Sequence, residues 1–444
     1  MDFFRILAIG LLSIHMFSAL GYAQNKPNII LIISDDHSYQ TIGAYGNKLV
    51  QTPNIDKIAK EGVVFNKAYV TNSICGPSRA AILTGTYSHK NGVIDNKPQN
   101  KLDGSQDNFA KQLQKAGYQT AWIGKWHLGS DPTGFSFWKI LPGQGDYYNP
   151  DFITASGKEQ KQGYIANVVE DEAEAWLNSV DKSKPFCLVV GHKSAHRNWM
   201  PDTVDLGAYD NTVFPLPHNF YDNYENREAA QRPSPTIGKI MKLSSDLKMY
   251  DYAQPNKAKY FKGANAAQEK KLLSYYKGIW EDFKAKNLKG KALTEWKYQR
   301  YMRDYLSTIN GLDRNIGRML DYLQKKGLEK NTVVIYMSDQ GFYMGEHGWF
   351  DKRWMYEESF RTPMIVKYPG TVKPGSKANG MVLNLDVAPT LLDIAKAPIP
   401  HQMQGKSFLP LITGATDIGY DILYYHYYEQ EFGLKTHFAV KTDC

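Results

Sequence analysis

The chain has 444 residues, of which 42% are hydrophobic and 22% charged, so it is long enough for a large core in one large or two unequal domains. The formal net charge of +8 mildly favours anionic ligands, although the lysines are scattered and form no basic run. The sequence shows no repeat, low-complexity tract or nucleic-acid-binding motif, which excludes a repeat array and gives no reason to expect a nucleic-acid partner.

Residues 1–23 have the pattern of a signal peptide. Arg5 precedes an apolar run over residues 6–20, and residues 21–23 supply small side chains for cleavage. The run is short for a membrane span, and no cysteine follows the cleavage point to carry a lipid. We therefore expect an exported protein, periplasmic or secreted, without a membrane anchor.

The first buried strand is predicted at residues 27–34, where a continuous apolar, β-branched run suits a parallel strand covered on both faces. It ends in Asp35 and Asp36. Ligands bind beyond the carboxyl ends of parallel strands, and two adjacent carboxylates there repel each other unless a cation neutralises them. Hard cations such as Ca²⁺ or Mg²⁺ take such oxygen ligands. A solvated acidic loop is the alternative that this pair alone leaves open.

A cysteine stands at the start of a predicted helix. Pro77 fits a first helical turn, which places Cys75 at or just before the helix N-terminus, where the macrodipole favours negative charge. Arg79 follows one turn later and can reach back to the same point. An electropositive helix start is the setting of a reactive cysteine, whereas buried apolar cysteine is the commoner role for a lone one.

Three more buried strands end in polar side chains. They are predicted at residues 119–123, 185–191 and 332–338, and the polar residues that follow are Lys125 and His127, His192 and His196, and Asp339 and Gln340. If the strand conformation continues past residue 123, Lys125 and His127 lie on one side of the chain. We predict that the four strand ends together form a site.

Helices are predicted between these strands, at residues 52–62, 108–117, 165–180, 294–327 and 386–395, and two further short strands at residues 63–70 and 363–368. The alternation predicts an α/β fold with a mostly parallel central sheet sandwiched by helices. Residues 200–290 break the alternation and contain only short helical pieces such as residues 268–277. We interpret them as an insertion that covers the substrate cleft, within a catalytic domain of residues 24–415.

The pattern Cys75-Gly76-Pro77-Ser78-Arg79 resembles the signature of the type I sulfatases, which belong to the alkaline-phosphatase-like superfamily. Other elements are similar to that family's site, namely Gly85-Thr86-Tyr87 closed by Gly92, Gly124-Lys125-Trp126-His127, His196, Ser338-Asp339-Gln340-Gly341 and Asp351-Lys352. The resemblance spans about residues 27–435. It implies that a sulfatase-maturating enzyme oxidises Cys75 to formylglycine, whose hydrate is the nucleophile.

The resemblance also implies the roles of the polar residues. The implied ligands of Ca²⁺, which is favoured over Mg²⁺, are Asp35, Asp36, the modified Cys75, Asp339 and Gln340. Many family members have Asn or His where Gln340 stands, but a Gln oxygen is also a hard ligand. The implied catalytic residues are Arg79 for the oxygens of the nucleophile, His127 for its second hydroxyl, Lys125 and Lys352 for the sulfate oxygens, and His196 rather than His192 as general acid.

The substrate is inferred from a narrower resemblance. Residues 192–201, 214–217, 351–363 and 424–428 resemble the N-acetylglucosamine-6-sulfatase branch, which implies a sulfated glycan and 6-O-sulfated N-acetylglucosamine as its reacting unit. Arg361 would bind substrate, as Lys125 and Lys352 would, or would pair with Glu358. Three tryptophans are expected either to stack on sugar rings or to fill core: Trp199, Trp349 and Trp354.

Sulfatases continue into a small carboxyl-terminal subdomain with a short antiparallel sheet and a helix. Residues 416–444 resemble only its start, so we expect a truncated chain with an uncovered sheet edge. Two other functions therefore stay open. One is a phosphonate or phosphate monoester hydrolase of the same superfamily, and the other is an inactive sulfatase-like protein that binds glycans.

Overall fold

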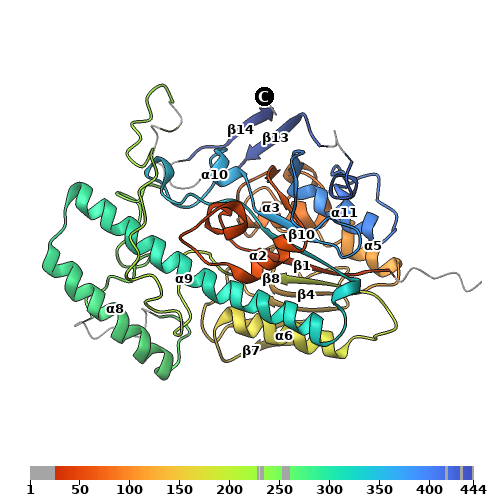
Figure 1. Ribbon diagram of the computed structural model, residues 1–444, viewed down its shortest axis with the longest axis horizontal. Coiled ribbons are helices and arrows are strands. Elements are labelled where there is room, and N and C mark those ends of the chain that lie inside the picture. The colour runs from red at the N-terminus through yellow and green to blue at the C-terminus, as the bar shows by residue number, and fades with distance from the viewer. Residues whose placement is uncertain are drawn as a thin grey trace, which may run out of the picture.

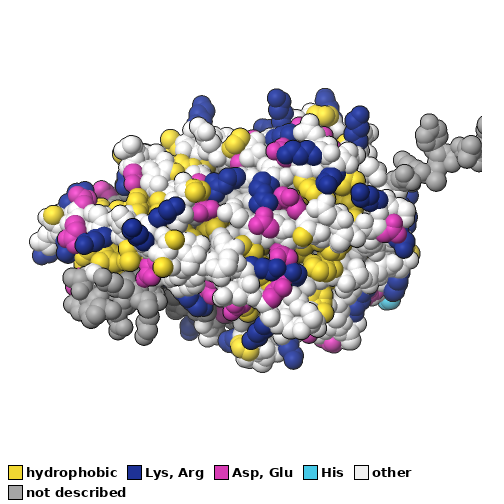
Figure 2. Space-filling model, turned by 90° about the horizontal axis from the view of Figure 1, so that it is seen from below, with side chains coloured by type: hydrophobic (Ala, Val, Ile, Leu, Met, Phe, Trp, Pro, Cys, Tyr) yellow, Lys and Arg dark blue, Asp and Glu magenta, His cyan; other side chains and the backbone are white. Residues whose placement is uncertain are grey.

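The computed structural model describes residues 26–227, 230, 235–252, 261–415, 419–430 and 434–442. The predicted signal peptide and Cys444 lie outside the described residues. Among the helices that are described, none combines the length and the apolar character that a membrane crossing requires. On the face seen in Figure 2, positive and negative side chains are interspersed, as the scattered lysines of the sequence predict.

A ten-stranded sheet forms the centre of the molecule, with the order β11-β2-β10-β9-β1-β8-β4-β5-β6-β7 (Figure 1). Its middle strands β9, β1, β8, β4 and β5 are parallel, whereas β10 and β6 flank them antiparallel. The strand bounds are β1 (Asn28–Ser34), β2 (Val63–Phe65), β4 (Gln119–Lys125), β5 (Phe137–Leu141), β6 (Asp151–Thr154), β7 (Gly157–Gln160), β8 (Phe186–Gly191), β9 (Thr332–Ser338), β10 (Met364–Lys367) and β11 (Ser376–Ala378). The prediction of an α/β fold with a mostly parallel central sheet is confirmed.

Helices cover both faces of the sheet, and β1 shows why its sequence is apolar throughout. Ile30 and Ile32 pack in one core cluster with α2 (Pro53–Lys60), α6 (Ile165–Ser179) and α9 (Gly290–Lys325). Ile29, Leu31 and Ile33 pack in the opposite cluster with α3 (Cys75–Thr84), α5 (Phe109–Lys115) and α11 (Val387–Ile394). A strand buried on both faces excludes water from its whole length, so only its ends can carry polar groups.

The structure differs from the prediction in three places. Residues 63–70 form two strands, because β2 joins the central sheet while β3 (Ala68–Tyr69) pairs with β12 (Val382–Leu383). Strands β5 to β7 are short and partly exposed: β6 and β7 carry polar residues and Lys139 interrupts β5, so none has the long apolar run that reveals a buried strand. Helix α8 (Ala266–Lys286) is longer than predicted. Only Leu272 and Tyr276 of its residues are buried, so its apolar stripe is weak and the sequence pattern does not reveal its full length.

The remaining elements are short. They are α4 (Ser88–Asn91), α10 (Glu357–Phe360), α12 (Leu409–Ile412) and the 3-10 turns Tyr39–Thr41, Gly43–Tyr45, Glu329–Asn331, Glu346–Gly348 and Asn384–Asp386. A separate antiparallel sheet pairs β13 (Ile422–Tyr427) with β14 (His437–Thr442), as predicted for the start of the small subdomain. Trp199, Trp349 and Trp354 are buried, so they fill core.

We expect Gly124→Ala to lower the free energy of unfolding by about 2–6 kcal/mol, because overpacking and a positive φ each cost about 1–3 kcal/mol. Gly124 lies in β4 with φ of +99°, and a Cβ there would stand 2.0 Å from the carbonyl oxygen of Gly191 in β8. Chemical denaturation measures the change. The matched control is Gly278→Ala in α8, whose Cβ would meet nothing within 4 Å and which should stabilise the protein by about 0.5–1 kcal/mol. Equal stability of Gly124→Ala and the unaltered protein would contradict the close approach of β4 and β8.

Candidate active site

The carboxyl ends of four parallel strands meet at one edge of the sheet, in the spatial order β9-β1-β8-β4. Backbone hydrogen bonds continue past the strand ends, since the Asp35 N–H donates to the Ser194 carbonyl (3.0 Å) and the Asp339 N–H to the Ser34 carbonyl (3.1 Å). The four polar clusters that the sequence places after separate strands are therefore neighbours in space.

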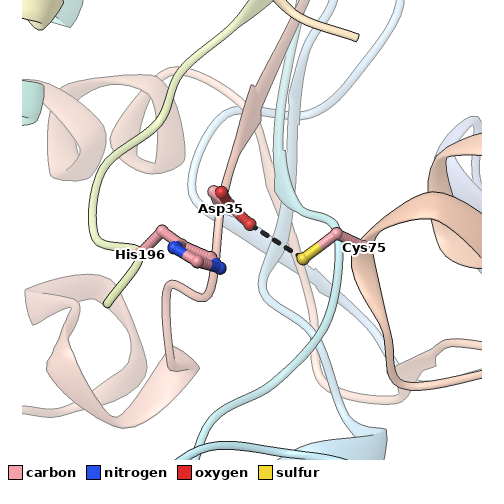
Figure 3. A group of neighbouring side chains, drawn as sticks. All are labelled: Asp35, Cys75 and His196. Atoms are coloured by element: carbon pink, nitrogen blue, oxygen red, sulfur yellow. Dashed lines mark hydrogen bonds between the residues drawn. The ribbon is translucent and has the colours of Figure 1, made fainter. Parts of the chain in front are cut away.

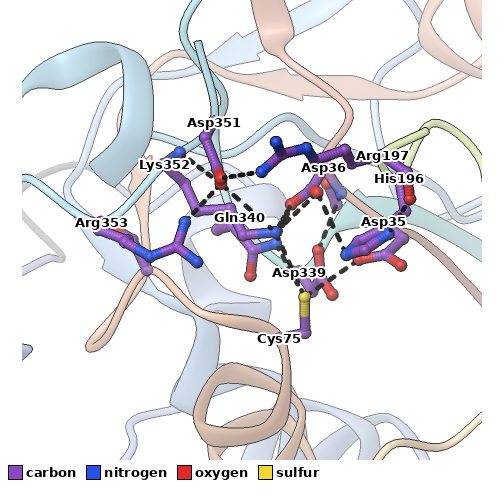
Figure 4. Close-up of polar contacts among 12 residues, drawn as sticks. Asp35, Asp36, Cys75, His196, Arg197, Asp339, Gln340, Asp351, Lys352 and Arg353 are labelled. Carbon is purple, nitrogen blue, oxygen red and sulfur yellow. Dashed lines mark hydrogen bonds and ion pairs between the residues drawn. The ribbon is translucent and has the colours of Figure 1, made fainter. Parts of the chain in front are cut away.

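Three buried carboxylates form the centre of this edge (Figure 4). Oxygens of Asp35, Asp36 and Asp339 lie within 4.8 Å of one another, and each side chain is at most 1% exposed. The Asp36 N–H donates to Asp339 Oδ1 at 3.1 Å, and Asp36 itself adopts a left-handed φ of +62° that turns the chain out of β1. Negative charges this close together and this deeply buried need neighbouring positive charge.

Three buried cations supply that compensation, each from a different part of the chain. Lys125, at the end of β4, contacts Asp35. Lys352 Nζ lies 2.6 Å from both Asp36 oxygens. Arg79 Nε, one turn into α3, lies 2.9 Å from Asp339 Oδ2. These contacts bring three residues predicted for catalysis onto three carboxylates predicted for metal binding.

The cations compensate the carboxylates unequally. Burial would raise the pKa of Asp35, but Lys125 and its other cationic neighbours outweigh it and hold that pKa well below the usual range. Burial raises the pKa of Asp36 although Lys352 opposes the shift. Burial and the charge of Asp35 raise the pKa of Asp339 to about 7. The carboxylates therefore still lack positive charge where Asp36 and Asp339 face each other.

Cys75 is the first residue of α3 and lies at the centre of this cluster. Its Sγ is 3.2 Å from Asp35 Oδ1, 3.5 Å from Lys352 Nζ and 3.6 Å from Gln340 Nε2. The residue is completely buried, and burial together with Asp35 raises the pKa of its thiol. The unmodified thiol is therefore protonated, so the reactive thiolate that a helix N-terminus suggests is not what this setting favours.

His196 faces the cluster from the loop after β8 (Figure 3). Its Nε2 lies 3.9 Å from Asp36 Oδ2, and its Nδ1 lies 2.6 Å from the Arg197 carbonyl oxygen. Because a carbonyl only accepts, Nδ1 carries the hydrogen and Nε2 is the nitrogen presented to the site. The His196 side chain is 15% exposed, whereas His192 is buried, so only His196 can meet a bound molecule.

His127 joins the site differently from the prediction. Strand β4 ends at Lys125, and His127 has a left-handed φ of +60°, so strand alternation does not place the two side chains. Gln144, between β5 and β6, connects them instead. Its Oε1 lies 2.5 Å from Lys125 Nζ and its Nε2 3.3 Å from His127 Nε2, while its carbonyl accepts from Lys193 at 3.0 Å.

Gln144 and Lys193 are site residues that the sequence analysis does not identify. The one signal for Gln144 is its position between two glycines with positive φ, Gly143 and Gly145, which mark a specially shaped loop. Lys193 follows His192 directly and looks like an ordinary loop lysine, but it is buried.

Arg361 is the predicted substrate residue whose described contacts lie outside the cluster. Its backbone bridges to Tyr69, and its guanidinium lies 4.2 Å from the ring centroid of Tyr39. These contacts do not test the predicted role of Arg361 in substrate binding, which stays a prediction.

The residues present fit a hard cation. Within the described part of the chain, Gln340 Oε1 is buried without a hydrogen-bond partner, while its Nε2 lies 2.5 Å from Asp36 Oδ1. Exchanging the two amide atoms would direct an oxygen toward the three carboxylates. The donor set is then oxygen only, as Ca²⁺ and Mg²⁺ require, and a further positive charge would meet the unbalanced Asp36 and Asp339.

Comparison with known proteins agrees with this geometry. The family model described as Sulfatase matches residues 27–397, which is most of the chain. The chain belongs to the sulfatase family. It is therefore a sulfuric ester hydrolase, as its sequence predicts, and its fold is that of the alkaline-phosphatase-like superfamily.

Individual relatives extend the comparison. The N-acetylglucosamine-6-O-sulfatase of Bacteroides thetaiotaomicron is 45% identical over 94% of this chain and 77% of its own. A solved structure of a protein in complex with its substrate, D-glucosamine-2-N,6-O-disulfate, is 44% identical with a TM-score of 0.90, covering 94% of this chain and 87% of that one. The phosphonate monoester hydrolase of Agrobacterium radiobacter shares the fold, with a TM-score of 0.63 at 19% identity over 90% of this chain and 80% of that one.

We expect Gln144→Leu to lower sulfatase turnover about 10- to 100-fold, as the loss of partners that orient functional groups does elsewhere. The substitution keeps the volume but removes the contacts to Lys125 and His127. Steady-state kinetics measure the loss, and thermal unfolding should be unchanged. The control is Gln162→Leu at an exposed position before α6, and equal turnover in the two variants would show that Gln144 has no part in the site.

Proposed function

We propose that this sulfatase hydrolyses the 6-O-sulfate of N-acetylglucosamine units in a glycan. The main observation behind this proposal is the position of Cys75, whose Sγ lies within 3.6 Å of a carboxylate, a lysine and an amide of one buried cluster. Two relatives at 44–45% identity support the substrate class, since one bears the name N-acetylglucosamine-6-O-sulfatase and the other binds a 6-O-sulfated glucosamine.

The proposal includes conversion of Cys75 to formylglycine by a maturating enzyme, as is typical of the family. The raised pKa of the Cys75 thiol supports this, because burial and Asp35 keep the unmodified side chain neutral and weakly nucleophilic. Formylglycine, when hydrated, supplies an oxygen nucleophile for the sulfur atom. Arg79 is hydrogen-bonded to both Asp339 and the Lys125 carbonyl, and its positive charge would stabilise negative charge on that oxygen.

Ca²⁺ would be held by Asp35, Asp36, Asp339 and Gln340, together with the modified residue 75. When bound, a divalent cation supplies positive charge that lowers the pKa of a bound hydroxyl and attracts sulfate oxygens. The same buried cluster contains Lys125 and Lys352, whose ammonium groups would bind the sulfate oxygens as negative charge grows on them. Gln144 would hold Lys125 in place through its amide oxygen.

His196, in its imidazolium form with hydrogens on both Nδ1 and Nε2, would donate the Nε2 proton to the departing sugar oxygen and become neutral with its hydrogen on Nδ1. An alkoxide is a poor leaving group, so protonation at the moment of bond cleavage is worth about 10²- to 10⁴-fold. The Nε2 of His196 is presented to the cluster and its side chain is open to a bound sugar. His127, whose Nδ1 has no hydrogen-bond partner in the described part of the chain, would assist at the second hydroxyl of residue 75.

The alternative as a phosphonate or phosphate monoester hydrolase is supported by fold likeness alone. The alternative as an inactive glycan-binding protein is disfavoured because the predicted metal-binding and catalytic side chains gather around one buried cluster. Export, to the periplasm or beyond, and coverage of the cleft by residues 200–290 belong to the proposal as predictions of the sequence.

We expect mass spectrometry to find the aldehyde at position 75 in protein made together with a maturating enzyme. That protein should release sulfate from N-acetylglucosamine 6-sulfate. Cys75→Ala should lower turnover by roughly 10⁴- to 10⁶-fold, as removal of a nucleophile does, without unfolding the protein. The control is Cys187→Ala in the buried strand β8, which should retain turnover. Substantial activity in Cys75→Ala would refute the nucleophile assignment.

We expect Ca²⁺ to raise the thermal unfolding midpoint and a chelator to reverse the rise. At 100 times the dissociation constant, the binding adds about 2.7 kcal/mol of stability. Asp339→Asn removes one buried carboxylate at constant shape and should abolish the shift. Asp321→Asn, at an exposed position of α9, should keep it. A midpoint of the unaltered protein that does not respond to Ca²⁺ would contradict the proposed metal site.

A further inference from the structure

The loop that carries His196 is held by a segment far along the chain, residues 245–248. His196 is fixed by its own loop first. Its Nδ1 donates to the Arg197 carbonyl at 2.6 Å, and its carbonyl accepts from the Tyr147 hydroxyl at 2.5 Å. The direction of Nε2 therefore depends on where the peptide after Arg197 lies.

Lys248 holds the two residues that follow Arg197. Its Nζ lies 2.9 Å from the Asn198 carbonyl oxygen and 2.9 Å from the Trp199 carbonyl oxygen. The side chain is 1% exposed, so its ammonium group depends on protein acceptors in place of water. One ammonium group therefore binds the carbonyl oxygens of both Asn198 and Trp199.

The neighbours of Lys248 hold the same loop. Asp246 accepts two hydrogen bonds from the Arg197 guanidinium, at 2.7 and 2.8 Å, and is itself buried. The Asn198 amide contacts the Ser245 carbonyl. Three consecutive residues after His196 are therefore each bound by residues 245–248.

Helix α9 anchors this arrangement to the body of the protein. Asp304 of α9 lies 2.7 Å from Lys248 Nζ and also accepts from Arg300 and from the Tyr276 hydroxyl. Trp199 packs on Tyr301 of the same helix, with ring centroids 4.6 Å apart. Because Asp304 keeps Arg300 as a partner, removal of Lys248 does not leave a buried charge alone.

We propose that Lys248 is a positioning residue for His196, acting through the Asn198 and Trp199 carbonyls that it binds. This inference rests on the proposed function, in which His196 protonates the departing oxygen. Loss of Lys248 frees the Asn198 and Trp199 carbonyls, of which the second belongs to a buried residue, so the peptide after Arg197 shifts and Nε2 loses its alignment with that oxygen. The sulfate subsite, built from Lys125, Lys352 and the carboxylates, makes no described contact with Lys248, Asn198 or Trp199, so it should keep its geometry.

The expected signature is a loss that depends on the leaving group. A sugar alkoxide needs the proton from His196, whereas a nitrophenolate leaves without one. In Lys248→Met, kcat for N-acetylglucosamine 6-sulfate should fall about 10- to 100-fold, as for a displacement of about 1 Å in a catalytic group. KM should stay within about twofold, and kcat for 4-nitrophenyl sulfate should fall less than about threefold.

Lys297→Met is the matched control. Lys297 of α9 is also a buried lysine that binds two carbonyls of the 200–290 region, those of Gly238 (3.0 Å) and Met241 (2.8 Å), but it makes no described contact with the His196 loop. It should lower stability without changing the ratio of the two kcat values. Asp246→Asn weakens the hydrogen bonds to the Arg197 guanidinium and should shift that ratio in the same direction as Lys248→Met. This variant replaces Lys248→Met in the test if Lys248→Met folds poorly.

Three results would overturn the inference. The first is an equal loss of kcat on both substrates in Lys248→Met. The second is a change in the ratio of the two kcat values in Lys297→Met that equals the change in Lys248→Met. The third is an unchanged ratio in both Lys248→Met and Asp246→Asn. Absence of sulfate release from the sugar by the unaltered, formylglycine-containing protein would overturn the proposed function, and the inference with it. The unaltered protein thus separates failure of the function from failure of the positioning role.

Discussion

The repulsion among three buried carboxylates is the constraint on which the rest of the site depends. Asp35, Asp36 and Asp339 stand within 4.8 Å of one another without exposure to water. The parallel pairing of β1 with β9 brings these carboxylates together, because Ser34 lies opposite Ser338 and the residue after each strand is an aspartate. Such a cluster persists only where other elements bring positive charge to it.

The topology of the sheet supplies that charge from separate parts of the sequence. Lys125 comes from the end of β4, two strands away from β1, and Arg79 comes from the first turns of α3. Lys352 comes from the long connection between β9 and β10. The same three cations surround the Cys75 side chain, so the groups that compensate the carboxylates also define the place where an anionic sulfate would bind. Compensation and catalysis in the proposed function thus depend on one set of contacts.

The sequence predicts the strands and the site to the extent that both are encoded by local pattern. The continuous apolar runs of β1, β8 and β9 leave their polar ends as the only places for charge, which is why Asp35, His196 and Asp339 could be found without coordinates. The Cys75 motif is equally local. Strands β5 to β7 could not be found, because they are short and partly exposed and so do not need a long, continuous apolar run.

Residues that act through distant backbone groups leave no such pattern. Gln144 and Lys248 bind partners as far as 49 and 56 positions away in sequence, and the contacts of both residues involve backbone carbonyl groups, which every residue possesses. Arg361 shows the same limit from the other side, since a motif predicts a substrate role whereas the described contact of its guanidinium is with the ring of Tyr39. Spacing rules identify side chains that meet along one strand or helix, but not those that meet across loops.

The central claim is that one buried cluster holds the cation, residue 75 and the sulfate together. The most direct measurement is a crystal structure of the Cys75→Ser variant with Ca²⁺ and N-acetylglucosamine 6-sulfate. We expect a cation bound by Asp35, Asp36, Asp339 and Gln340, sulfate oxygens on Lys125 and Lys352, and the bridging sugar oxygen at His196 Nε2. A cation bound elsewhere, or a sulfate that contacts neither lysine, would contradict it.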